Sequence, residues 1–94
     1  MTYYLVTRER GQRNSSLPMQ EQESWDAHAR FMNALVDNGF VVLGGPLGDG
    51  LEALLIIAAE SAEEIRSRLA DDPWTPMDLL PTAKVERWEV LLGR

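Results

Sequence analysis

Two short apolar runs constrain the fold of this chain more than any other feature. Residues 40–43 are Phe-Val-Val-Leu and residues 54–57 are Leu-Leu-Ile-Ile, so neither run contains a polar side chain. Continuous runs of this length near glycine are typical of buried β-strands. A strand with one face in water alternates apolar and polar residues instead. Both faces of a sheet built from these strands therefore require cover.

Two other segments have the pattern of amphipathic helices. Over residues 20–38, Trp25 and His28 begin a stripe of inward-facing positions at spacings of three and four. An Asn-Gly pair ends this helix, because glycine readily adopts the left-handed conformation that follows a helix. Ser61 and Glu64 form a capping-box signature, which opens a second predicted helix ending near residue 70.

Strands at the two ends of the chain complete the order β-α-β-β-α-β. Strands are predicted over residues 3–7, 40–43, 52–59 and 83–92, and the Gly-Gly-Pro sequence at 44–46 is expected to end the second one. This order is that of the ferredoxin-like fold. The fold belongs to the α+β class, and its two helices cover one face of a four-stranded antiparallel sheet.

The whole chain, residues 1–94, has the length of one domain with a single core. Its two helices can cover only one sheet face, so the apolar strands predict that a second copy covers the other face. We therefore expect a homodimer in which sheet packs on sheet. The alternative is that these strands are central in the sheet and are flanked by a long loop.

The composition excludes several kinds of chemistry. The chain has no cysteine, and therefore no disulfide, thiolate metal site or cysteine nucleophile. A single histidine argues against zinc and non-haem iron sites, which draw on several imidazoles. A magnesium or calcium site made of carboxylates stays open, although no acidic loop has the required spacing. With no Rossmann or P-loop glycine pattern either, we expect neither a metal nor a cofactor.

Charge and hydropathy narrow the possible partners. The net charge of −6 disfavours binding to nucleic acid, which requires a basic surface. The longest aliphatic run, over residues 53–59, is too short to cross a bilayer. The first residues lack the basic region of a signal peptide. We therefore expect a cytoplasmic location, no membrane contact, and a small molecule as the partner.

His28 and Asp72 are the candidates for an acid–base pair. A neutral imidazole can take a proton from a phenol or carbon acid and return it, and a carboxylate on its other nitrogen fixes its tautomer. Asp72 is preferred over its neighbour Asp71, because a residue before proline has a restricted backbone. The competing structural interpretation is a core histidine satisfied by a carbonyl or water, with an aspartate that only ends the helix.

The sequence resembles the YCII (YciI-like) family over nearly its whole length. The motifs that carry the resemblance lie at residues 25–32, 39–47, 72–74 and 85–88. The resemblance implies a dimeric α+β barrel, with an active site formed by the helix histidine and by the aspartate of an Asp-Pro-aromatic motif. These correspond to His28 and Asp72. It also implies chemistry on small hydroxylated or halogenated aromatic compounds.

The chain departs from the family pattern at two places. Many relatives carry Arg-Pro shortly before the histidine, where this chain has Trp-Asp-Ala at 25–27. A ligand contact made by that arginine would be missing or replaced. Asp78 stands where glycine is common, and aspartate tolerates a left-handed backbone better than most residues.

Six further residues are candidates for a substrate pocket beside the pair. They are Trp25, Trp74, Arg8, Gly44, Gly45 and Pro46. Trp25 lies one turn from the histidine and could stack on an aromatic ligand, although tryptophans are more often core or interface residues. The Gly-Gly-Pro backbone could contact a ligand closely, but an ordinary strand-ending turn is the more common role, and proline offers no N–H.

Arg8 forms a basic cluster with Arg10 and Arg13 at the end of the first predicted strand. These arginines could hold a carboxylate or phenolate over the site. Arginines in such a position more often belong to a solvated loop. The polar connection over residues 11–19 is long enough to act as a lid over a ligand.

Together these features predict a cofactor-independent enzyme that acts on a small aromatic or enolisable compound. His28 would be the general base or acid, Asp72 would orient it, and the pocket would lie between helix and sheet. Proton transfer alone suits isomerase, lyase or dehydrohalogenase chemistry. The alternative is a non-catalytic ligand-binding or sensing module on the same dimeric fold. A third possibility is a structural domain that binds another protein through Trp74 or the last strand.

Overall fold

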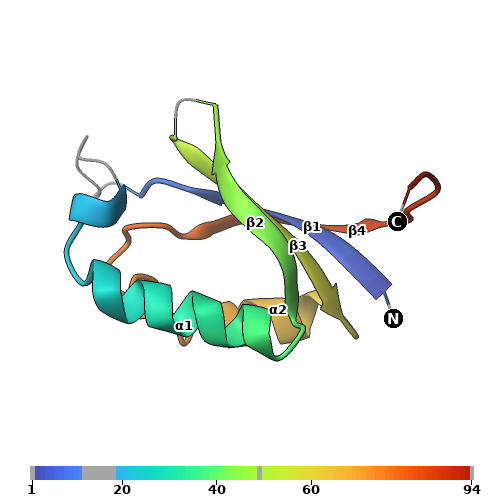
Figure 1. Ribbon diagram of the computed structural model, residues 1–94, viewed down its shortest axis with the longest axis horizontal. Helices are drawn as coiled ribbons and strands as arrows, with labels where there is room; N and C mark the ends of the chain where they lie inside the picture. The colour runs from blue at the N-terminus through green and yellow to red at the C-terminus, as the bar shows by residue number, and fades with distance from the viewer. Residues whose placement is uncertain (1, 12–18, 49, 94) are drawn as a thin grey trace.

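The computed structural model describes residues 2–11, 19–48 and 50–93. Its elements are β1 (Thr2–Glu9), α1 (Trp25–Asp37), β2 (Val41–Leu47), β3 (Glu52–Ala59), α2 (Ala62–Leu69) and β4 (Thr82–Trp88), with a 3-10 turn at Met19–Glu21. The strands form one antiparallel sheet in the order β2-β3-β1-β4. Both helices lie on the same face of this sheet (Figure 1). This is the ferredoxin-like α+β fold that the sequence predicts.

The core lies between the helices and the sheet. Along β1, Tyr4 and Val6 are buried because alternate side chains point toward the helices. Their neighbours across the ladder, Leu55 and Ile57 of β3, are buried on the same face. Ile65 of α2 is completely buried against this layer. The period-two burial of the strands and the inward stripes of the helices therefore meet in one apolar layer.

The opposite face of the sheet carries many apolar side chains, together with the Lys84–Glu86 ion pair of β4, and is not covered by any residue that the structure describes. Tyr3, Leu43 and Trp88 are 38%, 67% and 41% exposed, respectively. Leu54 and Ile56, which alternate with the core residues of β3, are only partly buried. Because their apolar runs do not alternate with polar residues, β2 and β3 carry apolar side chains on both faces of the sheet. The helices cover only one of these two faces.

The first helix begins later than the sequence pattern predicts. Residues 20–24 have side chains that favour helix, but Ser24 has a φ of 59°, in the left-handed region, and cannot be part of an α-helix. The chain instead forms the 3-10 turn at Met19–Glu21 and enters α1 at Trp25. The end of α1 agrees with the prediction, because Gly39 follows it with a φ of 85°.

The prediction that Gly44, Gly45 and Pro46 end the second strand is wrong. β2 continues to Leu47, and these three residues pair with Leu55, Leu54 and Ala53 of β3. β2 is an edge strand, so the N–H that proline lacks is not needed for a second ladder. The Gly-Gly-Pro sequence therefore forms part of the sheet edge.

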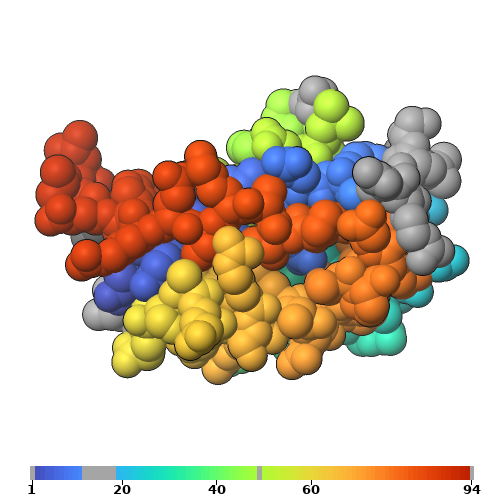
Figure 2. Space-filling model, turned by 180° about the vertical axis from the view of Figure 1, so that it is seen from behind, coloured from blue at the N-terminus to red at the C-terminus, as the bar shows by residue number. Residues whose placement is uncertain are grey.

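The last strand is shorter than predicted, because β4 ends at Trp88 instead of residue 92. Its neighbour β1 begins at Thr2, and Trp88 pairs with Tyr3, so β1 has only Thr2 left to pair with the residues that follow. Leu91 and Leu92 are 80% and 90% exposed. Figure 2 shows this C-terminal segment projecting from the end of the molecule.

The start of α2 follows the predicted capping box. The backbone N–H of Glu64 donates to Oγ of Ser61 at 3.1 Å. The carboxylate of Glu64 accepts a hydrogen bond from the backbone N–H of Glu60 at 2.9 Å. Two amide groups at the helix start, which have no partner inside the helix, are thereby satisfied.

Removing this cap tests its contribution to stability. We expect Ser61→Ala to lower the free energy of unfolding by about 1 kcal/mol, measured by urea denaturation. Ser67→Ala is the matched control, because Ser67 is exposed within the same helix and makes no cap, so its effect should stay below about 0.5 kcal/mol. Equal effects of the two substitutions would contradict the capping role of Ser61.

Candidate active site

His28 and Asp72 come from different parts of the chain and meet under the sheet. His28 lies one turn into α1 and is 8% exposed, whereas Asp72 lies on the turn after α2 and is completely buried. Nδ1 of His28 is 2.9 Å from Oδ2 and 3.0 Å from Oδ1 of Asp72. An ionised carboxylate only accepts hydrogen bonds, so Nδ1 carries the hydrogen in this contact. Asp71, the alternative partner, is exposed.

The Asp72 carboxylate has two further donors. Nη1 of Arg8 donates to Oδ2 at 2.7 Å, and the backbone N–H of Trp74 donates to Oδ1 at 3.0 Å. Burial raises the pKa of Asp72, but the hydrogen bonds from His28, Trp74 and Arg8, with the positive charge of Arg8, outweigh it and lower the pKa below its ordinary value. The carboxylate therefore stays ionised although it is out of contact with water.

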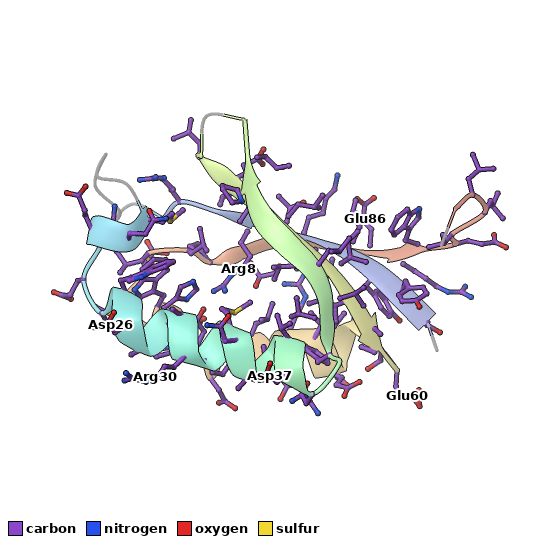
Figure 3. All side chains as sticks on the ribbon, in the orientation of Figure 1. Arg8, Asp26, Arg30, Asp37, Glu60 and Glu86 are labelled. Carbon is purple, nitrogen blue, oxygen red and sulfur yellow. The ribbon has the colours of Figure 1, made fainter. Side chains whose placement is uncertain are left out.

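Arg8 is a core residue of β1 and does not lie on a solvated loop. β1 extends two residues beyond its predicted end, and Arg8 continues the inward alternation of Tyr4 and Val6. It is 1% exposed, and its Nη2 donates to Oγ1 of Thr75 at 3.4 Å. Figure 3 shows it between the sheet and α1. Extending the period-two pattern of the strand would have placed this residue correctly.

Two tryptophans fix the plane of the imidazole. The ring of His28 stacks on that of Trp74, with centroids 3.8 Å apart and planes 6° apart. Trp74 is completely buried, and its indole N–H donates to the carbonyl of Glu23 at 2.6 Å. Trp25 lies obliquely to both rings, at 5.8 Å from His28 and 5.9 Å from Trp74. One ring face and Nδ1 are thereby held.

A cavity of about 620 Å³ opens beside the histidine. No residue that the structure describes hydrogen bonds Nε2 of His28, which is the ring nitrogen left for this space. The predicted residues in its lining are Arg8, Trp25, His28, Gly44, Gly45, Pro46 and Trp74. Asp72 is completely buried behind them and does not line the cavity. The structure thus brings His28 and the six candidate pocket residues together around one space, with Asp72 behind His28.

Several lining residues are not among the sequence candidates. They are Met19, Gln20, Met32, Gly48, Gly50, Ala53, Leu55 and Leu80. Arg10, which belongs to the same basic cluster of the sequence as Arg8, also lines the cavity, and helical spacing from His28 would have found Met32. Met19 and Gln20 come from the connection before α1, whose path has no periodic signal. Most of the proposed lid, residues 12–18, and Arg13 lie outside the described residues.

A second cavity, also of about 620 Å³, lies at the other end of the sheet. It is lined by Thr2, Tyr3, Arg87, Trp88, Glu89 and Val90. The single histidine of the chain lines the first cavity, so acid–base chemistry by an imidazole belongs there. Within residues 2–11, 19–48 and 50–93, no group of three histidine or acidic side chains could hold a metal ion. In the same part of the chain, no helix has the length and apolar character needed to span a membrane.

These features define a ferredoxin-like α+β protein with a buried His-Asp contact beside a cavity of small-molecule size. No family model and no curated protein matches the sequence. The structure is similar to that of 5-chloro-2-hydroxyhydroquinone dehydrochlorinase (TftG) from Burkholderia phenoliruptrix AC1100, solved in complex with 2,5-dihydroxybenzoquinone. The TM-score is 0.65 at 25% sequence identity, and the match covers 95% of this chain and 94% of that one.

The buried ion pair between Arg8 and Asp72 predicts that neutralising Asp72 greatly lowers the stability of the fold. Asp72→Asn leaves Arg8 buried without an anionic partner, which costs about 3 kcal/mol. We expect the free energy of unfolding near neutral pH, from urea denaturation, to fall by that amount. Asp71→Asn is the control, because Asp71 is exposed and its replacement should cost less than about 0.5 kcal/mol. Similar losses from both variants would contradict a structural ion pair.

The lowered pKa of Asp72 predicts that the difference in unfolding free energy between wild type and Asp72→Asn depends on pH. As the pH falls below the ordinary value of 3.8, the unfolded chain binds a proton before the folded protein does. The stability contributed by ionised Asp72 is therefore complete at neutral pH and is lost as the pH falls through the folded pKa. The difference in unfolding free energy between wild type and Asp72→Asn should shrink on acidification to about pH 3. A constant difference would contradict the lowered pKa.

Proposed function

We propose that this protein is an enzyme that transfers a proton on a small aromatic or enolisable compound, with His28 as base and acid and Asp72 as its positioning residue. The observation that carries the proposal is the environment of the imidazole. A buried carboxylate holds Nδ1 at 2.9 Å, and the ring lines a cavity of about 620 Å³ with Nε2 as the nitrogen that Asp72 does not engage. A base with one nitrogen fixed and the other open to a ligand is the arrangement that general acid–base catalysis requires.

The charges around His28 would stay balanced when it takes a proton from a bound acid. Before the reaction, the positive Arg8 and the negative Asp72 compensate each other across 2.7 Å. When Nε2 takes a proton from an O–H or C–H group of the substrate, the electron pair of that bond stays on the substrate as a phenolate or enolate. The imidazolium then faces this new anion, and the carboxylate of Asp72 stabilises it from behind.

The fate of the electron pair decides the reaction. In an isomerisation, the imidazolium returns its proton to another atom of the substrate. In a dehydrohalogenation of a dihydroxylated ring, the imidazolium first returns the proton to the halogenated ring carbon, which gives a keto tautomer with the halogen on a tetrahedral carbon. His28 then takes the proton of the second hydroxyl group, the electron pair of that O–H bond forms a carbonyl group and shifts the ring double bond, and the halide leaves with the electrons of the carbon–halogen bond to give a quinone. The proton on His28 then passes to solvent. Neither route requires a cofactor, a metal or a nucleophile from the chain.

The other lining residues would bind the substrate. Trp25 offers an indole beside His28 on which a flat ring can stack. The glycines of β2 expose their backbone, so a ring can approach the strand closely. Arg8 lines the same cavity and can donate hydrogen bonds to an oxygen of the substrate.

The structural similarity supports the proposed proton-transfer chemistry on an aromatic compound. The similar structure is that of a dehydrochlorinase with a dihydroxybenzoquinone bound. Dehydrochlorination of a hydroxylated ring is one of the reactions that a His-Asp pair can carry out by proton transfer. The motifs at residues 25–32, 39–47 and 72–74 lead us to propose that the chain is a member of the YCII family.

We also propose that two copies of the chain pack sheet on sheet. The uncovered face carries exposed Tyr3, Leu43 and Trp88, which a second copy would remove from water. The cytoplasmic location and the absence of nucleic-acid binding stay predictions from the sequence.

The test replaces His28 by asparagine, whose side-chain amide can still donate to Asp72 but cannot act as a base. With a panel of chlorinated dihydroxy- and trihydroxybenzenes, we expect wild type to release chloride and His28→Asn to lower kcat about a hundredfold or more. Amide NMR spectra would establish that the variant is folded. Full turnover by His28→Asn would overturn the proposal.

The competing function, a ligand-binding or sensing module, predicts a different outcome of the same experiment. Wild type would bind members of the panel reversibly, return them chemically unchanged and release no chloride. His28→Asn would then alter affinity alone.

A further inference from the structure

We infer that Arg8 is a positioning residue that keeps Nε2 of His28 without hydrogen, and therefore able to act as a base. Arg8 does this by supplying the positive charge that the buried Asp72 carboxylate requires. The inference rests on the proposed function in one respect, that Nε2 is the atom that takes the proton from the substrate.

Three side chains from different parts of the fold share one carboxylate. Nη1 of Arg8 donates to Oδ2 of Asp72 at 2.7 Å, and Nδ1 of His28 lies 2.9 Å from the same oxygen. All three side chains are buried. Water therefore does little to stabilise a net charge at this place, and the charges of the three groups have to balance one another.

With Arg8 present, the three groups are neutral together without any hydrogen on Nε2. The guanidinium of Arg8 is a cation, the carboxylate of Asp72 is an anion, and an imidazole with hydrogen on Nδ1 alone is uncharged. A guanidinium suits this role because it is not deprotonated in proteins. The buried cation is therefore permanent, and His28 does not have to provide one.

Without the arginine, the same groups would carry a net negative charge and would take up a proton. The new proton enters on Nε2, which is the ring nitrogen that Asp72 does not engage. The hydrogen between the two residues then lies either on Nδ1, which gives an imidazolium, or on Asp72, which gives a carboxylic acid beside a neutral ring. In both states Nε2 carries hydrogen and has lost the lone pair that a base requires.

The other charged side chains around His28 do not replace Arg8 in this role. On α1, Asp26 and Arg30 are exposed, so solvent screens their charges. Arg10 lines the cavity, and its Nε donates to the carbonyl of Gly50 on the hairpin between β2 and β3. Arg8, in contrast, contacts the carboxylate directly from within the core.

The remaining contacts of Arg8 favour a role of its charge over a contribution to stability. Its Nη2 donates to Oγ1 of Thr75 at 3.4 Å, and its Nε is buried without a hydrogen-bond partner among the described residues. A buried N–H group without a partner destabilises the fold. Replacing a whole buried ion pair by apolar side chains of similar volume often leaves a protein as stable or makes it more stable. The arginine is therefore better explained by its effect on Asp72 and His28.

The protonation of His28 can be measured directly, because the chain has a single histidine. Long-range 1H–15N NMR spectra at neutral pH distinguish a ring nitrogen that carries hydrogen from one that does not. In wild type we expect hydrogen on Nδ1 and none on Nε2. In Arg8→Met, which keeps an unbranched side chain but removes its charge, we expect Nε2 to carry hydrogen in most molecules.

Three further variants separate the charge of Arg8 from its packing. Arg8→Lys keeps a cation and should leave Nε2 without hydrogen. The double variant Arg8→Met/Asp72→Asn removes the anion together with the cation, so no proton is taken up and Nε2 should again lack hydrogen. Loss of packing alone would not be reversed in this way. Arg30→Gln removes a charge from the outer side of α1 (Figure 3) and should leave the imidazole signals unchanged.

Two results would overturn the inference. One is hydrogen on Nε2 in wild type at neutral pH, which requires no variant to fold. The other is a folded Arg8→Met whose Nε2 lacks hydrogen. Amide NMR spectra establish folding, and Arg8→Gln, which can still donate to Asp72 without a charge, is the second neutral variant, for which the same result is expected.

The imidazole spectra separate this inference from the proposed catalysis. For a substrate that wild type turns over, Arg8→Met should lower kcat at neutral pH about tenfold or more, and activity should recover at higher pH as the additional proton leaves. If wild type turns over no compound of the panel, the spectra still decide whether Arg8 controls Nε2. Chloride release that depends on His28, together with an unchanged Nε2 in Arg8→Met, would leave the proposed function standing and overturn the inference.

Discussion

The buried ion pair between Arg8 and Asp72 is the interaction on which the site depends. It joins the end of β1 to the turn after α2 at 2.7 Å, and the same carboxylate holds His28 of α1 at 2.9 Å. Three segments far apart in sequence thus meet at one carboxyl group. A carboxylate in this position would be costly to bury without its donors, so the arginine, the imidazole and the Trp74 amide stabilise it together. The geometry of the acid–base pair is therefore a property of the core.

The fold could be predicted from the sequence because its signals are local or periodic. The capping box at Ser61 and the glycine after α1 gave helix ends that agree with the structure. The late start of α1 and the continuation of β2 through Pro46 could not be found in this way. The first depends on the left-handed backbone of Ser24, and the second on the place of β2 at the edge of the sheet. Both are set by tertiary arrangement.

The sequence identified most residues of the candidate site, but only some of their contacts could be predicted from it. Because proline restricts the backbone of the residue before it, the sequence favoured Asp72 over Asp71. Asp72 is the residue in contact with His28. The buried position of Arg8 was missed, because a charged residue at a strand end usually faces solvent. Met19 and Gln20 reach the cavity from an irregular connection, and no periodicity in the sequence could have indicated their position.

Because β2 lies at the edge of the sheet, the wall of the cavity that would contact the substrate is separate from the groups proposed for proton transfer. The groups proposed for proton transfer are buried and depend on one another, so a change in any of them disturbs the rest. The opposite wall is glycine and proline backbone on a strand with one free edge. A Cβ introduced at Gly45 would meet nothing within 4 Å, whereas one at Gly44 would lie 2.6 Å from the end of the buried Leu55 side chain, which would have to move. Evolution could therefore reshape the range of accepted compounds by substitutions along β2 while the reactive centre stays intact.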